Sequence, residues 1–483
     1  MKDWLKREPI VITSGQGAVL RDARGREYLD ANSSIWTNLH GHNHPKLNAA
    51  LARQMKKISH SSALGFANEP ASLLAAELVQ VANQPSSSGR RNARSPFSLS
   101  KVFFSDNGST ALEVALKLSH EFARRTRGLK QPRFLSLDGA YHGDTIGAVS
   151  LGHIDLFHKA YGKLLFQSDK VMAPYCYRCP FNRAQPERND ARKYRQCGWE
   201  CVGLVERAFA ARRKRAEPYA AFVFEPLLQG AAGMIPQPSG WLKQVTDIAR
   251  GHGAQLIADE VMTGFGRTGV TCHVTKESIR RAMQKPEQSR LFACTRVGVQ
   301  PDYLCLAKGL TGGYLPMAAT LTTQPVFDAF LGEYDECKTF FHGHSYTGNQ
   351  LGAATARASL ELLRSATSVR ARARLQETMH DALKALWALP NVGDIRQVGL
   401  MAGVELVRDW RTREPLALRE RAGLRVCEAM AKRGVLTRPV GNVLVLMPPY
   451  GTTPAQARRM VSALHESVDE VLGKKARHGA GHL

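Results

Sequence analysis

The sequence lacks any apolar run of the roughly 18 residues that a membrane-spanning helix requires. Its first residues, Met1-Lys-Asp-Trp-Leu-Lys-Arg, lack the apolar core of a secretory signal peptide. Internal repeats are also absent, so nothing indicates a repeat architecture. We therefore expect a soluble globular protein of the cytoplasm without a membrane segment.

Acidic residues are scarce relative to basic ones: 42 Asp and Glu stand against 66 Lys and Arg, which gives a formal net charge of +24. An excess of this size could indicate a nucleic-acid partner. The basic residues are scattered, however, and do not alternate with aromatic residues as in RNA-binding surfaces. We interpret the charge as a solvated basic surface that also attracts anionic substrates and cofactors, and we expect no nucleic-acid partner.

In the absence of a secretion signal, the nine cysteines are expected to be reduced thiols. Five are isolated in the sequence, and the other four form two close pairs, Cys176 with Cys179 and Cys197 with Cys201. This spacing is typical of ligands to a structural zinc ion or an iron–sulfur cluster. Four unligated thiols explain the pairs equally well, and a metal here would brace a loop without taking part in chemistry.

A chain of 483 residues is too long for one ordinary core, so we expect two domains. Strands and helices alternate within residues 46–323, the pattern of an α/β domain with a mostly parallel, doubly wound sheet. Two insertions interrupt it, a cysteine-containing one at about 174–203 and a basic one at about 270–290. Residues 1–45 and 324–483 are expected to form a smaller α+β domain.

The C-terminal part mixes both kinds of element. Helical periodicity predicts long helices near Leu351–Leu363 and Ala371–Leu386. Short apolar runs predict strands near Val398–Leu406 and Val443–Met447. This mixture is the basis for predicting an α+β domain.

Two short segments each contain an apolar run that ends on a charged residue: Asp259 in Gln255–Met262, and Lys308 in Pro301–Lys308. Apolar runs of this length, flanked by turn residues, predict buried strands of a parallel sheet. Ligands bind at the carboxyl ends of such strands, so we expect both charges in one cleft. Taken alone, such residues would more often be a strand terminus and a surface charge.

A buried carboxylate needs a cationic partner, and a buried lysine must be neutral or covalently bound. Pyridoxal 5'-phosphate (PLP) satisfies both needs, because its protonated ring nitrogen pairs with an aspartate and its aldehyde forms a Schiff base with a lysine. The glycine-rich turn Gly309–Pro316 directly after Lys308 would let a ligand approach closely. We therefore predict PLP as the cofactor, bound by Asp259 and Lys308.

A further anchor for this cofactor is predicted where the strand Lys101–Phe104 leads into a helix. Free backbone N–H groups at the start of this helix, together with the hydroxyls of Ser109 and Thr110, suit a phosphate group. The same residues could be an ordinary helix cap. Tyr141 follows another predicted strand, Arg133–Leu137, where its ring could stack on a flat cofactor.

Five motifs carry a resemblance that extends over essentially the whole chain. They are Phe104–Thr110, Tyr141–Gly147, Ala258–Gly269, Leu306–Pro316 and Phe341–Asn349. In these motifs the sequence resembles the class III aminotransferases of PLP fold type I. The resemblance implies a PLP-dependent transaminase with a large PLP-binding domain and a smaller domain.

The resemblance also implies a role for each predicted anchor. Lys308 would form the Schiff base, and Asp259 would pair with the pyridine nitrogen. Gly108 and Ser109 would hold the phosphate. Tyr141 would stack near the ring and the substrate.

Other expectations rest on the resemblance alone. Gly343, His344 and Ser345 match the segment that, in family dimers, reaches the cofactor phosphate and the substrate of the neighbouring subunit. Arg438 matches the arginine that binds the substrate carboxylate, a task that suits a bidentate guanidinium. A homodimer with shared active sites is therefore expected.

Within the family, the versions of Tyr141–Gly147 and Gly312–Pro316 favour members that aminate 8-amino-7-oxononanoate in biotin biosynthesis, with S-adenosylmethionine as the amino donor. The substrate site would include Ile35 and Trp36, where many members have two adjacent tryptophans. Relatives that use L-lysine also lack the double tryptophan, so lysine is a second candidate donor. The alternative is another ω-aminotransferase, acting on ornithine, 4-aminobutyrate or a diamine.

Family members usually begin earlier, with a Trp-His-Pro-Tyr/Phe-Thr-like segment that contributes an aromatic residue to the substrate site. We expect the natural start to lie upstream of Met1. A chain made from Met1 would then bind substrate poorly.

Overall fold

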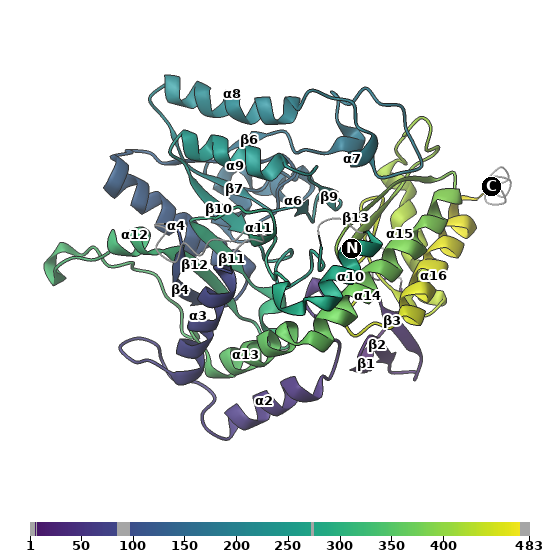
Figure 1. Cartoon of the computed structure of the whole chain (residues 1–483), viewed down its shortest axis with the longest axis horizontal. Coiled ribbons are helices and arrows are strands. Elements are labelled where there is room, and N and C mark those ends of the chain that lie inside the picture. Colours follow the sequence, from purple (N-terminus) through teal and green to yellow (C-terminus); the bar gives the residue numbers. More distant parts are fainter. Residues whose placement is uncertain (1–4, 6, 85–96, 272–274, 474–483) are drawn as a thin grey trace.

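The computed structural model describes residue 5 and residues 7–84, 97–271 and 275–473. Its largest element is a seven-stranded sheet (Figure 1). In spatial order its strands are β4 (Leu99–Ser105), β12 (Ala318–Thr323), β11 (Tyr303–Leu306), β10 (Gln255–Asp259), β7 (Tyr219–Phe224), β5 (Arg133–Leu137) and β6 (Asp169–Val171). Strand β12 pairs antiparallel with β4 and β11, and the other pairs in this sheet are parallel. The predicted α/β fold with a mostly parallel sheet is therefore confirmed.

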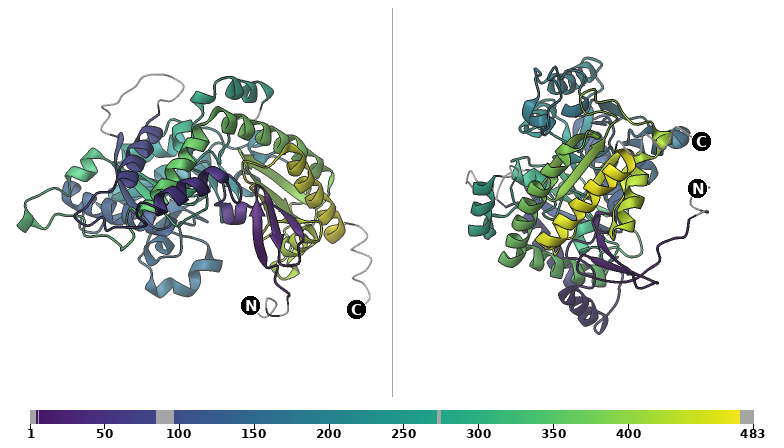
Figure 2. Two further views of the ribbon diagram at one scale, coloured as in Figure 1. Left: turned by 90° about the horizontal axis from the view of Figure 1, so that it is seen from below. Right: turned by 90° about the vertical axis from the view of Figure 1, so that its right-hand side faces the viewer.

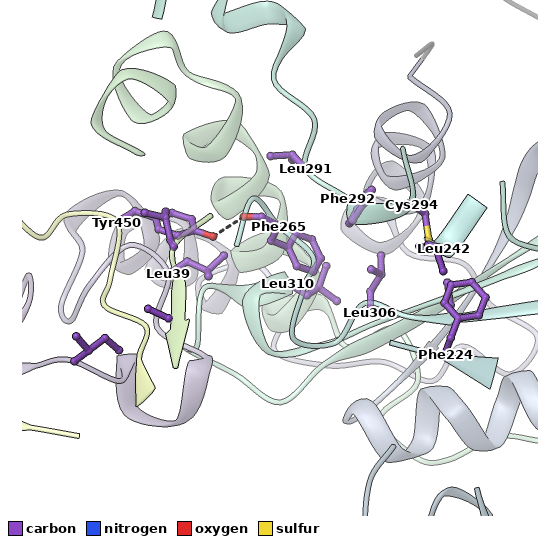
Figure 3. Close-up of a cluster of buried hydrophobic side chains, with 14 of the residues drawn as sticks. Leu39, Phe224, Leu242, Phe265, Leu291, Phe292, Cys294, Leu306, Leu310 and Tyr450 are labelled. Atoms are coloured by element: carbon purple, nitrogen blue, oxygen red, sulfur yellow. Dashed lines mark hydrogen bonds between the residues drawn. The ribbon is translucent and has the colours of Figure 1, made fainter. Parts of the chain in front are cut away.

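Helices cover both faces of this sheet, which explains why a central strand such as β7 is apolar along its whole length. In β7, Phe222 and Phe224 pack on one face, whereas Ala221 and Val223 pack on the other. The first face is covered by α3 (Glu69–Ala82), α8 (Glu200–Lys214) and α9 (Trp241–Gly251). The opposite face is covered by α4 (Gly108–Arg127), α5 (Ile146–Ser150) and α12 (Gln324–Asp328). Figure 3 shows part of the first core, including Phe224 and Leu242.

The direction of the strands decides where a ligand can bind. Strands β4, β5, β7, β10 and β11 all end at the same edge of the sheet, because β12, between β4 and β11, is antiparallel to both. The residues that follow these strand ends come from distant parts of the chain. They are brought together at one edge, where open α/β sheets bind ligands.

Two smaller sheets form a second region that combines both ends of the chain. One consists of β1 (Ile12–Gln16), β2 (Val19–Asp22), β3 (Glu27–Asp30) and β15 (Val435–Leu436). The other consists of β13 (Val392–Val398), β14 (Met401–Leu406), β17 (Val443–Leu446) and β16 (Pro439–Val440). Their helices are α14 (Ala366–Leu383), α15 (Ala422–Lys432) and α16 (Pro454–Leu472). Figures 1 and 2 show the purple N-terminal strands beside the green and yellow C-terminal elements.

The two predicted insertions, at about 174–203 and about 270–290, contain short elements of their own. These are η2 (Cys176–Arg178) and α7 (Ala191–Tyr194) in the first, and α10 (Lys276–Gln284) and η3 (Pro286–Gln288) in the second. Helix α10 packs on the second region, with Ile279 against Val369 of α14. The domain boundaries after residues 45 and 323 stay predictions.

The remaining helices and strands connect these parts. They are α1 (Ser33–Trp36), α2 (Pro45–Met55), α6 (Asp155–His158), η1 (Lys159–Leu164), β8 (Leu228–Gln229), β9 (Ile235–Pro236), α11 (Ala293–Arg296), η4 (Lys308–Thr311), η5 (Tyr334–Glu336), α13 (Gln350–Arg364), η6 (Lys384–Ala388) and η7 (Leu418–Glu420). Helices α13 and α14 confirm the two long helices predicted in the C-terminal part. Across the described ranges, no helix is both long and apolar enough to cross a membrane.

The strand predicted near Val398–Leu406 is confirmed as β14, but the strand β13 that precedes it was not predicted. The chain forms an antiparallel hairpin of β13 and β14 there, in which Val398 pairs with Met401. The turn contains Gly399, whose φ of 60° is rare for a residue with a side chain. Because the apolar residues continue across the turn, the pattern alone did not reveal the reversal.

Candidate active site

A cavity of about 440 Å³ opens at the carboxyl edge of the large sheet. Among the residues that line it are the predicted site residues Trp36, Gly108, Ser109, Tyr141, Asp259 and Lys308. The predicted residues that do not line it are Ile35, Gly343, His344, Ser345 and Arg438. The cavity therefore combines predicted anchors that follow β4, β5, β10 and β11.

Asp259, the last residue of β10, is buried and accepts two hydrogen bonds. Its Oδ1 accepts the N–H of Val261 (3.0 Å), and its Oδ2 lies 2.8 Å from Nδ1 of His142. Burial alone would lower the pKa of His142, but the hydrogen bond and the charge of Asp259 raise that pKa above its ordinary value. The Nδ1 atom of His142 and the N–H of Val261 therefore both face the side-chain oxygens of Asp259, which lines the cavity.

Lys308 follows β11, which pairs with β10. In this pair Cys305 of β11 lies opposite Asp259 of β10. The backbone of Lys308 has a φ of 43°, a left-handed conformation that costs a non-glycine residue about 1–3 kcal/mol. The Nζ atom lies 4.8 Å from the centre of the Trp36 ring, and no described residue accepts a hydrogen bond from it. Burial lowers the pKa of Lys308, against the opposing charges of Asp259 and Glu225. The amine therefore becomes neutral more readily than an ordinary lysine, as a nucleophile or base requires.

The first turn of α4 lines another wall of the cavity. The side chain of Asn107 accepts the N–H of Thr110 (3.1 Å), while the N–H groups of Gly108 and Ser109 have no acceptor among the described residues. A Cβ atom on Gly108 would come 2.8 Å from Cγ1 of Val261, so a larger residue would displace the turn. Free N–H groups at the start of a 20-residue helix suit a phosphate.

Tyr141 lines the cavity, and its hydroxyl donates to Oδ2 of Asp144 (2.7 Å). Burial and the bond to Asp144 raise the pKa of Tyr141, and the positive charge of Arg438 opposes the rise. Arg438 lies between β15 and β16, is exposed, and forms no ion pair with another described residue. Its guanidinium is therefore available to an anion on the Tyr141 side of the cavity.

Two buried residues of the cavity, Glu225 and His142, were not among the predicted site residues. Glu225 directly follows β7; its Oε2 accepts the N–H of Gly230 (2.9 Å) and its Oε1 accepts that of Tyr141 (3.4 Å). Burial raises the pKa of Glu225 to about 7, although the charge of His142 opposes the rise. The signal that could have placed Glu225 is the one that placed Asp259, an apolar strand followed by an acid.

The predicted dimer segment lies outside the cavity of its own chain. Gly343 and Ser345 are exposed, and the neighbouring Phe341 is 71% exposed. Nδ1 of His344 lies 3.1 Å from Oδ2 of Asp106, just ahead of the α4 turn. This segment is therefore accessible to a second molecule.

Of the two alternatives for Cys176, Cys179, Cys197 and Cys201, a bound metal finds no support in the structure. Within the described part of the chain, no group of three or more His, Cys, Asp or Glu side chains is arranged to bind one. Cys176 packs with Tyr177, whereas Cys201 belongs to the main hydrophobic core. Burial raises the pKa of Cys176 to about 12 and that of Cys201 to about 11, and the neighbouring cysteines add to both rises.

Sequence comparison relates the chain to known proteins over nearly its whole length. Residues 2–278 and 289–468 match the family described as aminotransferase class-III. The chain is similar to the adenosylmethionine-8-amino-7-oxononanoate aminotransferase of Geobacter sulfurreducens, with 44% identity over 98% of this chain and 95% of that protein. The protein of the same name from Nitratidesulfovibrio vulgaris is 43% identical over 99% of this chain and 80% of its own length.

Solved structures show the same relationship. The adenosylmethionine-8-amino-7-oxononanoate aminotransferase of Methanocaldococcus jannaschii has a TM-score of 0.82 and 36% identity, over 97% of this chain and 95% of that one. A PLP-bound amine transaminase from an uncultivated Pseudomonas species has a TM-score of 0.81 and 30% identity, over 97% of this chain and 96% of that one. The similarity therefore extends over both regions of the fold.

Proposed function

Because the chain belongs to the class III aminotransferases, we propose that it converts 8-amino-7-oxononanoate to 7,8-diaminononanoate in biotin biosynthesis. The observation that carries this proposal is the full-length similarity, at 44% identity, to a relative named for that reaction. The alternative, an ω-aminotransferase for ornithine, 4-aminobutyrate or a diamine, is not favoured, since the amine transaminase relative is only 30% identical.

The residues of the cavity fit PLP, the cofactor of this family. Asp259 offers a carboxylate for a protonated ring nitrogen, and Lys308 offers an amine to which no described residue is hydrogen-bonded. The free N–H groups of Gly108 and Ser109 would hold the phosphate. When bound, PLP supplies the electron sink that allows an amino group to pass between two carbon atoms.

Lys308 is the proposed proton carrier of the transfer. Its lowered pKa favours the neutral amine, the form that accepts a proton as a general base. His142 holds the side chain of Asp259 in position from the buried side, through the contact of its Nδ1 with Oδ2 of Asp259 (2.8 Å). Trp36 and Tyr141 line the cavity with aromatic rings, which would exclude water from the amine.

Arg438 and Ile35 are proposed to meet the part of the substrate that lies away from the reacting carbon. The substrate ends in a carboxylate, which an exposed guanidinium can bind through two hydrogen bonds. Arg438 is exposed near Tyr141 and has no described ion-pair partner. Ile35 is 47% exposed next to Trp36, so it can contact a chain that enters the cavity.

We further propose a cytoplasmic homodimer with shared active sites. Gly343, His344 and Ser345 would contribute to the neighbouring subunit's site, which fits their position outside their own cavity. Phe341 and Tyr346 on the same segment are 71% and 63% exposed, and such apolar surface suits an interface. The cytoplasm is the proposed location because the reaction uses metabolites of the cell interior.

S-adenosylmethionine is the proposed amino donor, in line with the names of the relatives. L-lysine is the second candidate, because Ile35 stands beside Trp36 in place of a second tryptophan. The test incubates purified protein with PLP, 8-amino-7-oxononanoate and either donor, and detects diaminononanoate by mass spectrometry. Product from one donor would identify both reaction and donor. If neither donor gives product, the ω-aminotransferase alternative is favoured.

The same assay tests the lysine. Lys308→Ala is expected to give no product and to lack the visible absorbance of PLP joined to a lysine. Lys338→Ala is the control, because Lys338 is a surface residue paired with Glu336 (2.6 Å) and should leave activity unchanged. An unaltered absorbance in Lys308→Ala would rule out this lysine as the attachment point.

A further inference from the structure

Glu225 is held in the cavity by a short relay of hydrogen bonds. Its Oε2 accepts the N–H of Gly230 (2.9 Å). The carbonyl of Gly230 in turn accepts the N–H groups of Gly233 (3.1 Å) and Met234 (3.0 Å). The turn is tight, since Gly233 has a φ of 108° and a Cβ on Gly230 would come 2.4 Å from Sδ of Met262. The position of the Glu225 carboxylate therefore depends on where this turn is held.

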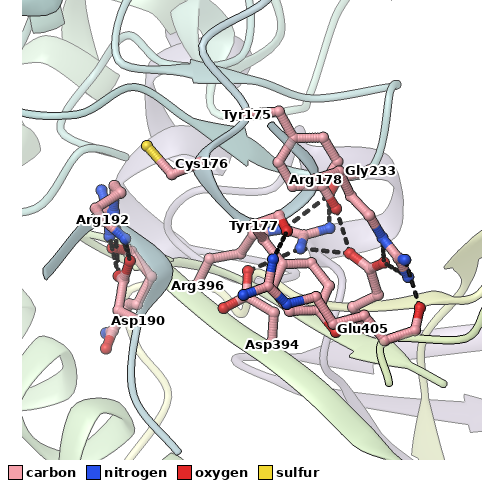
Figure 4. Close-up of polar contacts among 12 residues, drawn as sticks. Tyr175, Cys176, Tyr177, Arg178, Asp190, Arg192, Gly233, Asp394, Arg396 and Glu405 are labelled. Atoms are coloured by element: carbon pink, nitrogen blue, oxygen red, sulfur yellow. Dashed lines mark hydrogen bonds and ion pairs between the residues drawn. The ribbon is translucent and has the colours of Figure 1, made fainter. Parts of the chain in front are cut away.

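The turn is held by Arg396, a residue of β13. Its guanidinium donates to the carbonyl of Gly233 from both Nη2 (2.6 Å) and Nε (3.1 Å). Its third nitrogen, Nη1, donates to Asp394 (3.0 Å) and Glu405 (2.6 Å). Arg396 is 1% exposed, so these charged hydrogen bonds lie in surroundings that strengthen them. Figure 4 shows this network.

Two side chains of the segment 174–203 donate hydrogen bonds to the carboxylate of Glu405, which also accepts one from Arg396. Arg178 donates to Oε1 of Glu405 from Nε (2.9 Å) and Nη2 (2.7 Å), and the hydroxyl of Tyr175 donates to Oε2 (Figure 4). The guanidinium carbon of Arg396 lies 4.9 Å from the centre of the Tyr175 ring. Burial favours the neutral acid, but the charges of Arg396 and Arg178 outweigh it and lower the pKa of Glu405. The segment thus keeps an ionised anchor in place for Arg396.

We propose that Arg396 is a positioning residue for the transamination. Through the turn at Gly233 it fixes the carboxylate of Glu225 in the cavity, although Arg396 itself does not line the cavity. The segment 174–203 holds Arg396 in this position. The inference rests on the proposed function, because it assigns Glu225 a role beside Lys308, the lysine of that reaction.

The charge of Glu225 matters because other ionisable groups surround it. His142, Asp259 and Lys308 all interact electrostatically with it in the cavity. Burial raises the pKa of Glu225 to about 7, and the N–H of Gly230 counteracts the rise. If the turn moves away, Glu225 loses this N–H and holds a proton to higher pH. Lys308 then loses one of the two negative charges that favour its cationic form.

A pH titration of the visible absorbance of PLP bound to the whole protein tests this inference. Arg396→Lys keeps a positive charge near Asp394 and Glu405. A lysine ammonium cannot at the same time replace the two hydrogen bonds that the guanidinium donates to the carbonyl of Gly233. We expect the absorbance transition to move toward lower pH by about 0.5 unit or more, since a negative charge near Lys308 is lost.

Arg433→Lys is the matched control. Arg433 also bridges two acids, Glu466 (3.1 Å) and Glu470 (2.7 Å), but at the protein surface and away from the turn. Its absorbance transition should stay at the wild-type pH. An equal shift in both variants would overturn the inference, because the change would then follow from any lost guanidinium.

A double variant separates positioning from a general loss of structure. If Arg396 acts through Glu225, then Glu225→Gln shifts the transition in the same direction, and adding Arg396→Lys causes no further shift. If the shifts of the two single variants add in the double variant, the inference is overturned but the proposed function is not. The same holds if the Arg396→Lys protein makes product and its absorbance transition does not shift. Wild-type protein without any PLP absorbance would overturn the proposed function as well.

If Arg396→Lys does not fold, Tyr175→Phe provides the same test with a smaller change. It removes the hydroxyl that donates to Glu405 and leaves the Arg396 side chain intact. We expect a smaller shift of the transition, again toward lower pH. An unshifted transition in this variant would count against the inference.

Discussion

Several residues around the cavity have a backbone conformation that non-glycine residues seldom adopt. Trp36 (φ 67°) and Lys308 (φ 43°) line the cavity, and Leu227 (φ 68°) and Met234 (φ 54°) flank the turn that binds Glu225. Each costs about 1–3 kcal/mol and persists only where the surrounding packing enforces it. The geometry at Lys308 is therefore imposed by the fold and not by its local sequence.

Glu225→Gln is expected to stabilise the protein at alkaline pH. The pKa of Glu225 is about 7 in the folded protein, against an ordinary value of 4.5, so between these values the folded state binds a proton that the unfolded state has lost. Stability from this group therefore falls as pH rises from about 4.5 to 7, by about 3 kcal/mol in total. Glutamine does not titrate, so the variant avoids this loss. Its single carbonyl oxygen cannot accept both N–H groups, however, so we expect the free energy of unfolding to rise by only about 1–2 kcal/mol at pH 8.

Urea unfolding at pH 5 and pH 8 checks this prediction. The gain should appear at pH 8 and vanish at pH 5, where Glu225 is already protonated in the folded protein. Glu361→Gln, at a position whose side chain is 77% exposed, is the control and should change stability little at either pH. A gain of the same size at both pH values would show that Glu225 is not the titrating group.

At the scale of the elements, three strands of the large sheet are mainly apolar and have a charged residue at or just after their carboxyl end. Strand β7 is followed by Glu225, β10 ends on Asp259, and β11 is followed by Lys308 after one intervening residue. A charge inside one of these strands would face a layer of helix-covered apolar side chains, where burial is costly. The elements thus restrict charged side chains to the edge where a ligand can meet them.

Gly108→Ala, at the start of α4, is expected to weaken PLP binding by about tenfold or more, equivalent to ~1.4 kcal/mol. Alanine favours the helix, but its Cβ would lie 2.8 Å from Cγ1 of Val261, so the turn that offers free N–H groups must shift. Equilibrium dialysis of PLP measures the effect. Gly251→Ala in α9 is the control, because its Cβ would have no atom within 4 Å. Equal affinity in both variants would exclude Gly108 from the phosphate site.

At the scale of the whole molecule, the segment 174–203 joins the large sheet to the second region. Arg188 donates to the carbonyls of Val392 (2.7 Å), Leu389 (2.6 Å) and Trp387. Other arginines at this junction, Arg178, Arg192 and Arg413, likewise bind carbonyls or carboxylates across it. Part of the basic excess that the sequence suggested for the surface is therefore used inside the protein.

Arg188→Ala is expected to lower the free energy of unfolding by about 2–4 kcal/mol, because it removes charged hydrogen bonds to partly buried carbonyls. Chemical denaturation followed by tryptophan fluorescence measures the loss. Arg213→Ala is the control, since Arg213 is exposed on α8 and should change stability by less than about 0.5 kcal/mol. Similar losses in both variants would mean that the junction contributes little.

The sequence by itself determined the local features of this protein. Asp259 and Lys308 could be found because an apolar run that ends on a charge has one common cause, a buried strand that stops at a polar edge. The helix start at Gly108 and the alternation of strands and helices were readable for the same reason, since each is decided within about ten residues. The reversal at Gly399 was missed because its flanking residues are apolar on both sides.

Only the tertiary structure decided which distant groups meet. His142 and Asp259 are 117 positions apart and Arg396 and Gly233 are 163 positions apart, so neither pair leaves a local pattern. The cysteine pairs are the opposite case, in which a suggestive spacing leads to no group of three or more metal-binding side chains in the described ranges. Whether polar groups pair depends on burial and on competing partners, and both are set by the packing of the whole chain.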